Sequence, residues 1–262
     1  MTSRDHAPAG APTWVDLWTS DVDGSRAFYS ELFGWVAEEP SAEFGGYFMF
    51  TREGVPVAGG MGDMPDMPAD NSWKIYLATD DIERTAKAAE ANGAELFGPA
   101  MPVADLGIQA VLADPTGATL GAWQAGTFPG LTVLEEPGTP SWFELHTRDH
   151  ATAIAFYHDV FGWETEAVSD TDEFRYSMMQ NPEGGMGLAG VMDAASFLPE
   201  GRSSYWSIYW ETADVDASIA KATSLGAKVV HPAEDTPYGR LAVVADPQGA
   251  SFRLIGPNAA QA

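Results

Sequence analysis

The chain is a tandem duplication, and this constrains its fold more than any other feature. Residues 13–35 read TWVDLWTSDVDGSRAFYSELFGW, and residues 141–163 read SWFELHTRDHATAIAFYHDVFGW. Many identical residues recur in these two segments at one constant spacing. That spacing is much longer than the roughly 20 to 50 residues of a solenoid repeat, so each copy is a whole domain. Positions at which the copies agree are expected to build the fold, and positions at which they differ are where function can diverge.

Each copy divides again into two similar units. In the first copy, strands are predicted over 14–19, 47–51, 55–61, 73–79, 107–113 and 118–124, and helices over 22–33 and 82–91. Ser20 or Asp21 is the candidate N-cap of the first helix and Asp81 that of the second, and Gly34 is a candidate C-terminal stop. The units of the second copy begin at Trp142 and Trp206. The sequence therefore predicts an α+β protein of four βαβββ modules with mixed sheets and outer helices.

Composition excludes several classes of partner and chemistry. The formal net charge is −25, and so acidic a surface repels phosphate backbones and anionic lipids, so neither a nucleic acid nor a membrane is expected as a partner. The chain has no cysteine, which excludes disulfides, thiolate nucleophiles and cysteine-ligated metals. The first twelve residues lack the apolar segment of a signal peptide, and no apolar run reaches the ~18 residues of a membrane helix. A cytoplasmic protein is the expectation.

The domain boundaries follow from the repeat. We predict one domain over 12–126 and a second over 140–257. Residues 127–139 are rich in glycine and proline and include an acidic pair, which is typical of a solvated linker. Whether the modules pair within each half or across the halves stays open, and so does the choice between a monomer and a homodimer.

Taken together, these motifs resemble the vicinal oxygen chelate superfamily, which holds glyoxalase I, bleomycin-resistance proteins and extradiol dioxygenases. The resemblance rests on a strand followed by Asp and FYxxxFGW, a second strand and helix ending in NGA or LGA, and a closing DPxG turn, in this order in both copies. It covers nearly the whole chain and is strongest to two-domain actinobacterial proteins described as glyoxalase-like or as hydroxylases. The resemblance implies two tandem glyoxalase/bleomycin-resistance-type domains, whose paired modules curl into a cupped sheet with the ligand on its concave face.

The resemblance also implies a divalent metal, held by His and Glu side chains on the first and last strands of paired modules. In the family pattern one ligand lies seven residues before each helix-opening Asp, and another lies seven residues after the Asp of DPxG. These positions hold Trp14, Lys74 and Gly121 in the first copy and Trp142, Ser207 and Arg253 in the second. None is a usual ligand, and Lys74 or Arg253 would repel a cation. We therefore expect no usual metal site in either half and predict no cofactor.

Two residues on the first strand of the second copy are the best candidates for chemistry. A strand alternates its faces, so Asp16 and Trp18 share the face of Trp14, and the second copy holds Glu144 and His146 there. Glu144 and His146 are a candidate acid/base pair or half of a displaced metal site. The alternatives are polar groups that bind a ligand, or that line a solvated cleft or a domain interface.

Further residues on the predicted cup surface are candidates for binding an apolar or aromatic small molecule. They are Asp16, Trp18, Lys74, Tyr76, Trp123, Tyr209 and Arg253. The aromatic members of this set are equally compatible with an ordinary core. The tryptophans that recur in both copies are expected to build the fold.

Three functions remain open. The leading hypothesis is a small-molecule-binding protein of this superfamily without the usual metal site. The second is an enzyme, either a lyase or isomerase of glyoxalase type or an oxygenase-like hydroxylase, that uses Glu144 and His146. The third is a structural or interaction protein whose cups are filled by side chains.

Overall fold

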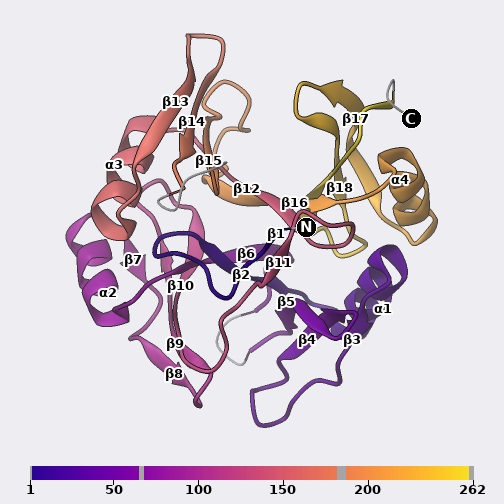
Figure 1. Ribbon diagram of the computed structural model, residues 1–262, viewed down its shortest axis with the longest axis horizontal. Coiled ribbons are helices and arrows are strands. Elements are labelled where there is room, and N and C mark those ends of the chain that lie inside the picture. Colours follow the sequence, from indigo (N-terminus) through magenta and orange to yellow (C-terminus); the bar gives the residue numbers. More distant parts are fainter. Residues whose placement is uncertain (1, 65–67, 182–186, 260–262) are drawn as a thin grey trace.

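The computed structural model describes residues 2–64, 68–181 and 187–259, and it folds into two halves that each contain one large sheet (Figure 1). The order in the first sheet is β3-β4-β5-β2-β6-β10-β9-β7, with β8 paired to β9, and the order in the second is β13-β14-β15-β12-β16-β19-β18-β17. Each half therefore joins two βαβββ modules side by side. The predicted α+β class with four βαβββ modules is confirmed, and the modules pair within the halves.

The elements of the first half are β2 (Pro12–Trp18), α1 (Val22–Phe33), β3 (Val36–Ala37), β4 (Phe48–Arg52), β5 (Val55–Met61), β6 (Ser72–Ala78), α2 (Ile82–Ala91), β7 (Glu95–Leu96), β8 (Met101–Val103), β9 (Gly107–Ala113) and β10 (Thr119–Ala125). Both helices have the predicted bounds. Each begins at an Asp whose side chain accepts a backbone N–H, from Gly24 for Asp21 and from Arg84 for Asp81. Helix α1 ends at Gly34, whose φ of 74° is the left-handed conformation that glycine adopts most easily.

The second half repeats the first. Its elements are β12 (Pro140–Thr147), α3 (His150–Phe161), β13 (Thr165–Asp170), β14 (Arg175–Met179), β15 (Gly190–Asp193), β16 (Tyr205–Glu211), α4 (Val215–Ser224), β17 (Lys228–Thr236), β18 (Gly239–Ala245) and β19 (Ser251–Gly256). Strands β12 and β16 form the antiparallel centre of the sheet, and β15 and β19 flank them in parallel. Figure 1 shows β13 and β14 rising on one side of this centre and β17 and β18 on the other, so the sheet is strongly curved.

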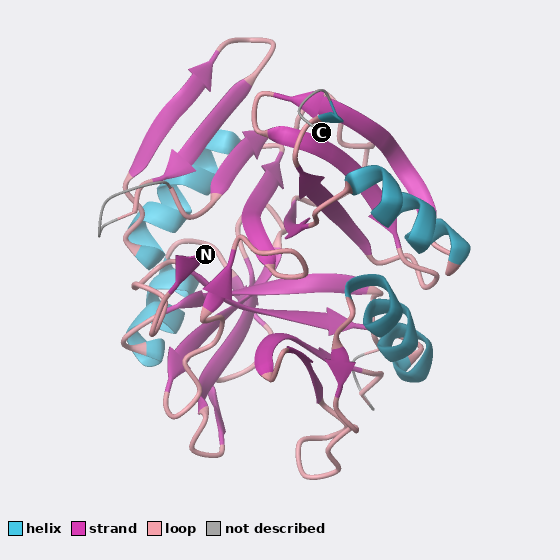
Figure 2. Cartoon of the chain, turned by 45° about the vertical axis from the view of Figure 1, so that its right-hand side comes forward, coloured by secondary structure: helices cyan, strands magenta, loops and turns pink. Residues whose placement is uncertain are grey.

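The halves pack against each other through helices as well as sheets. Helix α1 lies beside α4, and α2 lies beside α3, as two pairs at opposite sides of the molecule (Figure 2). None of the helices in the described ranges is long and apolar enough to span a membrane.

The motifs that agree between the copies meet across the boundary between the halves. The Tyr29 hydroxyl of the first FYxxxFGW donates to Asp246 Oδ2 of the second DPxG at 3.0 Å. In return, the Tyr157 hydroxyl donates to Asp114 Oδ2 at 2.8 Å. Each tyrosine oxygen also accepts an indole N–H at 3.0 Å, from Trp73 in one case and Trp206 in the other. The motifs that the duplication marks as structural therefore hold the two halves together.

The segment between the halves departs from the prediction of a solvated linker over 127–139. Leu131 is fully buried, and its N–H donates to the carbonyl of Thr13 at 2.7 Å. Residues Val133–Leu134 form β11, which pairs with β1 (Thr2–Ser3). The apolar residues of this segment explain the difference, because they cover the first half and bury their own surface there.

Candidate functional site

The polar side chains predicted on the second copy lie together on the face of the curved sheet opposite α3 and α4. Glu144 pairs with Ser207, and Tyr209 pairs with Arg253, in the register of β12, β16 and β19. His146 follows Glu144 on the same face of β12. We call the group Glu144, His146, Ser207, Tyr209 and Arg253 the C-half cup.

A connected set of hydrogen bonds joins these residues. His146 Nε2 lies 2.8 Å from Glu144 Oε1, and the Tyr209 hydroxyl donates to the same oxygen at 2.7 Å. Arg253 Nη2 lies 2.9 Å from His146 Nε2, and Arg253 Nε donates to Ser207 Oγ at 3.1 Å. Glu144 is 4% exposed and His146 is 1% exposed. The alternative in which these two groups line a solvated cleft is therefore wrong.

The imidazole of His146 is engaged on one nitrogen and free on the other. Nε2 faces both the Glu144 carboxylate, which accepts, and the Arg253 guanidinium, which only donates. One nitrogen cannot donate to the first and accept from the second at the same time. Nδ1 is buried and has no hydrogen-bond partner within the part of the chain that the structure describes. A buried polar atom without a partner is costly, so Nδ1 is a position at which a ligand or water would gain a hydrogen bond.

The electrostatics favour an ionised glutamate beside a neutral histidine. Burial by itself would raise the pKa of Glu144, but the hydrogen bond and charge of His146, together with the positive field of Arg253, lower it below its usual value. Burial lowers the pKa of His146 and Arg253 lowers it further, while Glu144 offsets part of that effect. In this state Nε2–H donates to Glu144, and Nδ1 carries the free lone pair.

Aromatic side chains surround this polar centre. Tyr205 stacks on the His146 ring with centroids 4.9 Å apart and an interplanar angle of 2°, and Phe197 meets the same ring edge-on at 6.0 Å. The Tyr176 hydroxyl accepts the Trp142 indole N–H at 2.9 Å. A hydrogen bond to Glu144 contributes to the raised pKa of Tyr176, whose largest cause is burial.

Tyr176 and Tyr205 are not among the site residues predicted from the sequence. One signal for Tyr176 was available, because Tyr47 stands immediately before the corresponding strand of the first copy. Tyr176 reaches Glu144 by passing over Gly190, where a Cβ would lie 1.8 Å from the tyrosine hydroxyl. The close approach of this ring therefore requires a glycine on β15.

The first half builds a similar carboxylate centre. Asp16 is buried and accepts the Trp14 indole N–H at 2.9 Å and the Tyr47 hydroxyl at 2.7 Å. Tyr76 supplies a further hydrogen bond. Burial raises the pKa of Asp16 to about 6, although these three donors each lower it. The centre has no counterpart of the His146 imidazole, because Trp18 takes that place.

The remaining candidates of the first half fill its concave face. Lys74 forms an ion pair with Asp70, and its ammonium lies 5.3 Å from the centroid of the Trp18 ring. Trp123 donates its indole N–H to the carbonyl of Phe128 at 3.1 Å. Where the second half has Arg253, the first has Gly121, and a Cβ there would lie 2.0 Å from the Tyr76 ring. All five predicted residues of this half, Asp16, Trp18, Lys74, Tyr76 and Trp123, are buried together.

The residues present do not fit the metal that the fold family implies. In the described ranges, no group of three or more His, Cys, Asp or Glu side chains could hold a metal ion. The C-half cup offers one imidazole and one carboxylate, and the Arg253 guanidinium lies 2.9 Å from that imidazole. A guanidinium has no lone pair to give a metal and repels a divalent cation. Among the described residues at the carboxylate centre of the first half, Asp16 is the one such ligand, so these residues do not make a metal site there either.

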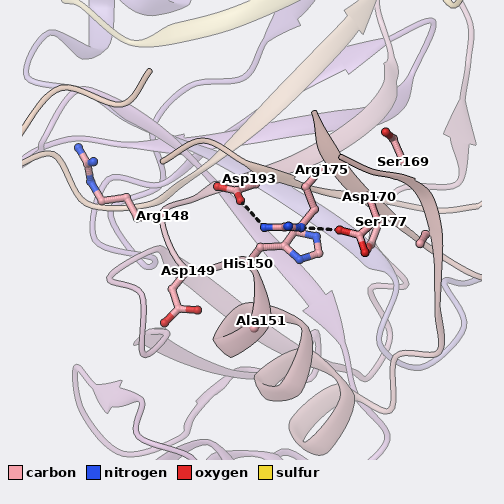
Figure 3. Close-up of a pocket in the computed structure, with 10 residues that line it drawn as sticks. Arg148, Asp149, His150, Ala151, Ser169, Asp170, Arg175, Ser177 and Asp193 are labelled. Atoms are coloured by element: carbon pink, nitrogen blue, oxygen red, sulfur yellow. Dashed lines mark hydrogen bonds and ion pairs between the residues drawn. The ribbon is translucent and has the colours of Figure 1, made fainter. Parts of the chain in front are cut away.

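Two cavities lie away from both carboxylate centres. One, of about 370 Å³, lies between the start of α3 and strands β13 and β14, where Arg175 bridges Asp170 and Asp193 at 2.6 and 3.1 Å beside His150 (Figure 3). The other, of about 680 Å³, lies where α2 meets the end of α3. Neither is lined by residues of the C-half cup.

Comparison with known proteins identifies the family. Residues 13–121 match the model of the glyoxalase-like domain, and residues 139–254 match that of the Glyoxalase/Bleomycin resistance protein/Dioxygenase superfamily. The chain belongs to this superfamily. Solved structures with a similar fold include a Mn(II)-bound glyoxalase from Novosphingobium aromaticivorans, with a TM-score of 0.62 and 16% identity over 95% of this chain and 82% of that one. The halotolerant catechol dioxygenase BphC has a TM-score of 0.63 and 13% identity over 95% and 87% of the two chains. At this identity the likeness concerns the fold.

Two relatives in the superfamily are more similar in sequence. The Mycobacterium tuberculosis protein named "Putative glyoxylase CFP32" is 34% identical over 262 residues, which cover 98% of each chain. The "Anthracycline biosynthesis protein DnrV" of Streptomyces peucetius is 34% identical over 267 residues, covering 94% of this chain and 93% of that one. Both therefore share the tandem arrangement along nearly their whole length.

Proposed function

We propose that the chain is a small-molecule-binding protein of this superfamily, that its ligand site is the C-half cup, and that binding does not depend on the family's metal. The observation that carries the proposal is the free Nδ1 of His146, a buried nitrogen without a described partner. It lies in a group that also contains a buried carboxylate and a guanidinium. Pockets that bind small molecules combine a few convergent polar groups of this kind with apolar walls.

The walls favour a flat aromatic ligand. Tyr205 stacks on His146, and Phe197 stands at the edge of the same ring. Rings of this kind bind planar molecules by offset stacking and edge contacts. One of the relatives is named for anthracycline biosynthesis, and anthracyclines contain planar fused aromatic rings. A hydroxyanthraquinone is therefore the first probe to test.

The test is a calorimetric titration of 1,4-dihydroxyanthraquinone into protein dialysed against a chelator. We expect one binding event per chain with the same Kd before and after chelation. A probe at 100 times its Kd should stabilise the fold by about 2.7 kcal/mol. Glu144→Gln should weaken binding at least about tenfold. Its matched variant, Asp16→Asn at the equivalent position of the filled first half, should change Kd less than about twofold.

Three results would count against this proposal. If the ligand no longer binds after a chelator has removed bound metal, the ligand site would be a metal site. A larger effect of Asp16→Asn than of Glu144→Gln would move the site to the first half. No binding of the hydroxyanthraquinone or of other planar aromatic compounds would favour the alternative of filled cups.

A second candidate function is a metal-free acid/base enzyme, and the 2.8 Å contact between Glu144 and His146 favours it. A carboxylate that orients an imidazole is a common arrangement for a general base, and the free Nδ1 would be the proton acceptor. The test is turnover of a hemithioacetal by the wild type, by Glu144→Gln and by His146→Ala. Loss of about 100-fold or more in kcat in both variants would support catalysis, and equal turnover would remove both residues from it.

A further inference from the structure

Arg253 is a cation in the C-half cup, and no carboxylate of the described residues contacts it directly. Its guanidinium donates to Ser207 and lies 2.9 Å from His146 Nε2, whose proton is given to Glu144, and it lies 5.1 Å from the centroid of the Tyr209 ring. In the described ranges, no Asp or Glu oxygen lies within 4.0 Å of its nitrogens. By contrast, Arg240 on the outer surface of the same half contacts both Asp216 and Asp235, at 3.0 and 2.8 Å.

Burial lowers the pKa of Arg253, but Tyr209 and Glu144 raise it above its usual value, so the charge is partly offset without a contacting carboxylate. An anion in direct contact would add charge-assisted hydrogen bonds that the half-buried guanidinium lacks. The Glu144 carboxylate is engaged by His146 and Tyr209 and does not touch the guanidinium. We propose that Arg253 anchors an anionic oxygen of the ligand, so that the C-half cup takes a planar aromatic carboxylate or phenolate. This inference rests on the proposed function and adds the charge of the ligand to it.

The surroundings of Arg253 suit such a molecule. Two exposed aromatic side chains stand beside the cup, and exposed aromatic surface of this kind marks binding sites. Phe197 is 54% exposed and contacts His146, and Phe174 is 43% exposed and stacks on Tyr176 with ring centroids 5.8 Å apart. A ring held among these side chains can direct its oxyanion to Arg253 on the floor.

The first half lacks this anchor, so the site occurs once per chain. Gly121 stands at the position of Arg253, and the Tyr76 ring fills the space above it. Lys74, the cation of the first half, is paired with Asp70. The stoichiometry expected from these contacts is one aromatic anion per chain.

The overall charge of −25 opposes the binding of an anion. Its repulsion and the attraction of Arg253 act over different distances. At physiological ionic strength the Debye length is about 8 Å, so surface carboxylates beyond that range are largely screened. A guanidinium in direct contact with the ligand, away from bulk water, is screened much less. The local cation therefore outweighs the distant negative surface.

The experiment compares 2-naphthoate with 2-naphthamide, which have the same ring system and differ in charge. In calorimetric titrations of the wild type, we expect naphthoate to bind at least tenfold more tightly, with one site per chain. Arg253→Gln should reduce this preference to less than twofold. Arg253→Lys keeps the charge and should retain a preference of threefold or more. Arg240→Gln removes the same charge from the outer surface and should leave the tenfold preference in place.

Each other outcome overturns a defined part of the reasoning. Equal binding of the two probes by the wild type, a preference that survives in Arg253→Gln, or two sites per chain would overturn the anchor while leaving the proposed function standing. If neither probe binds, and the hydroxyanthraquinone does not bind either, the proposed function fails and the anchor with it. If Arg253→Gln does not fold, as judged by its unfolding transition, Arg253→Lys and the wild-type preference decide the question.

Discussion

Replacing Asp16 by asparagine tests whether ionisation of this buried carboxyl group destabilises the fold. Burial raises the pKa of Asp16 from 3.8 to about 6 in the folded protein. Because the folded pKa is the higher one, the stability contribution is fully present below pH 3.8 and is lost as pH rises through 6. Each pKa unit corresponds to 1.36 kcal/mol, so ionisation costs the fold about 3 kcal/mol in total, of which about 2 kcal/mol falls between pH 4.5 and 7.5. Asparagine has the same shape and no charge, so it avoids this cost.

The assay is urea unfolding of the wild type and Asp16→Asn, followed by tryptophan fluorescence at several pH values. The free energy of unfolding of the variant minus that of the wild type should rise by about 2 kcal/mol from pH 4.5 to 7.5. Asp23→Asn is the control, because the Asp23 side chain on the same half is 92% exposed. Its difference from the wild type should stay constant. If the Asp16→Asn difference stays flat or falls with pH, the assignment of Asp16 as a costly buried charge is wrong.

Three further predictions use the same unfolding assay. Glu144→Gln should show the opposite pH trend, because the pKa of Glu144 is lowered below 4.5 in the fold. The stability that this variant loses relative to the wild type should be largest at pH 7 and should shrink towards pH 3.5. A loss that grows on acidification would refute the electrostatic coupling of Glu144 with His146 and Arg253. Tyr29→Phe leaves the buried Asp246 without its hydrogen-bond donor from the other half and should lower the free energy of unfolding by about 1–3 kcal/mol. A decrease below about 0.5 kcal/mol would mean that this contact does not hold the halves together. Gly190→Ala places a Cβ 1.8 Å from the Tyr176 hydroxyl and should lower the free energy of unfolding by about 2–3 kcal/mol. Unchanged stability would show that the Tyr176 ring can move away from the new Cβ.

The helices and their ends were predictable because their signals are local. An Asp whose side chain accepts the N–H three residues later, as Asp21 does from Gly24, is visible in the sequence, and so is the glycine that ends α1. Strand alternation also predicted that Glu144 and His146 share a face, and they lie 2.8 Å apart. The expectation that residues 127–139 are solvated was wrong for Leu131, because glycine and proline content does not show whether an apolar residue packs against a neighbouring domain.

The cup depended on contacts between strands that are far apart in the chain. The proximity of Arg253 to His146 follows from the order β12-β16-β19, and an offset of one residue in either pairing would move a side chain to the other face. The approach of Tyr176 to Glu144 depends likewise on the glycine between them.

By itself, the sequence determined the duplication, the α+β modules, the helix bounds and the residues that differ between the copies. These properties depend on periodicity and capping, which act over a few residues. Only the tertiary structure decided that the modules pair within each half, that FYxxxFGW and DPxG join the halves through Tyr29 and Asp246, and that Arg253 lies beside His146 whereas Tyr76 covers Gly121 in the first half. Those outcomes depend on sheet register and on which buried groups find partners, and both are set when distant segments pack together.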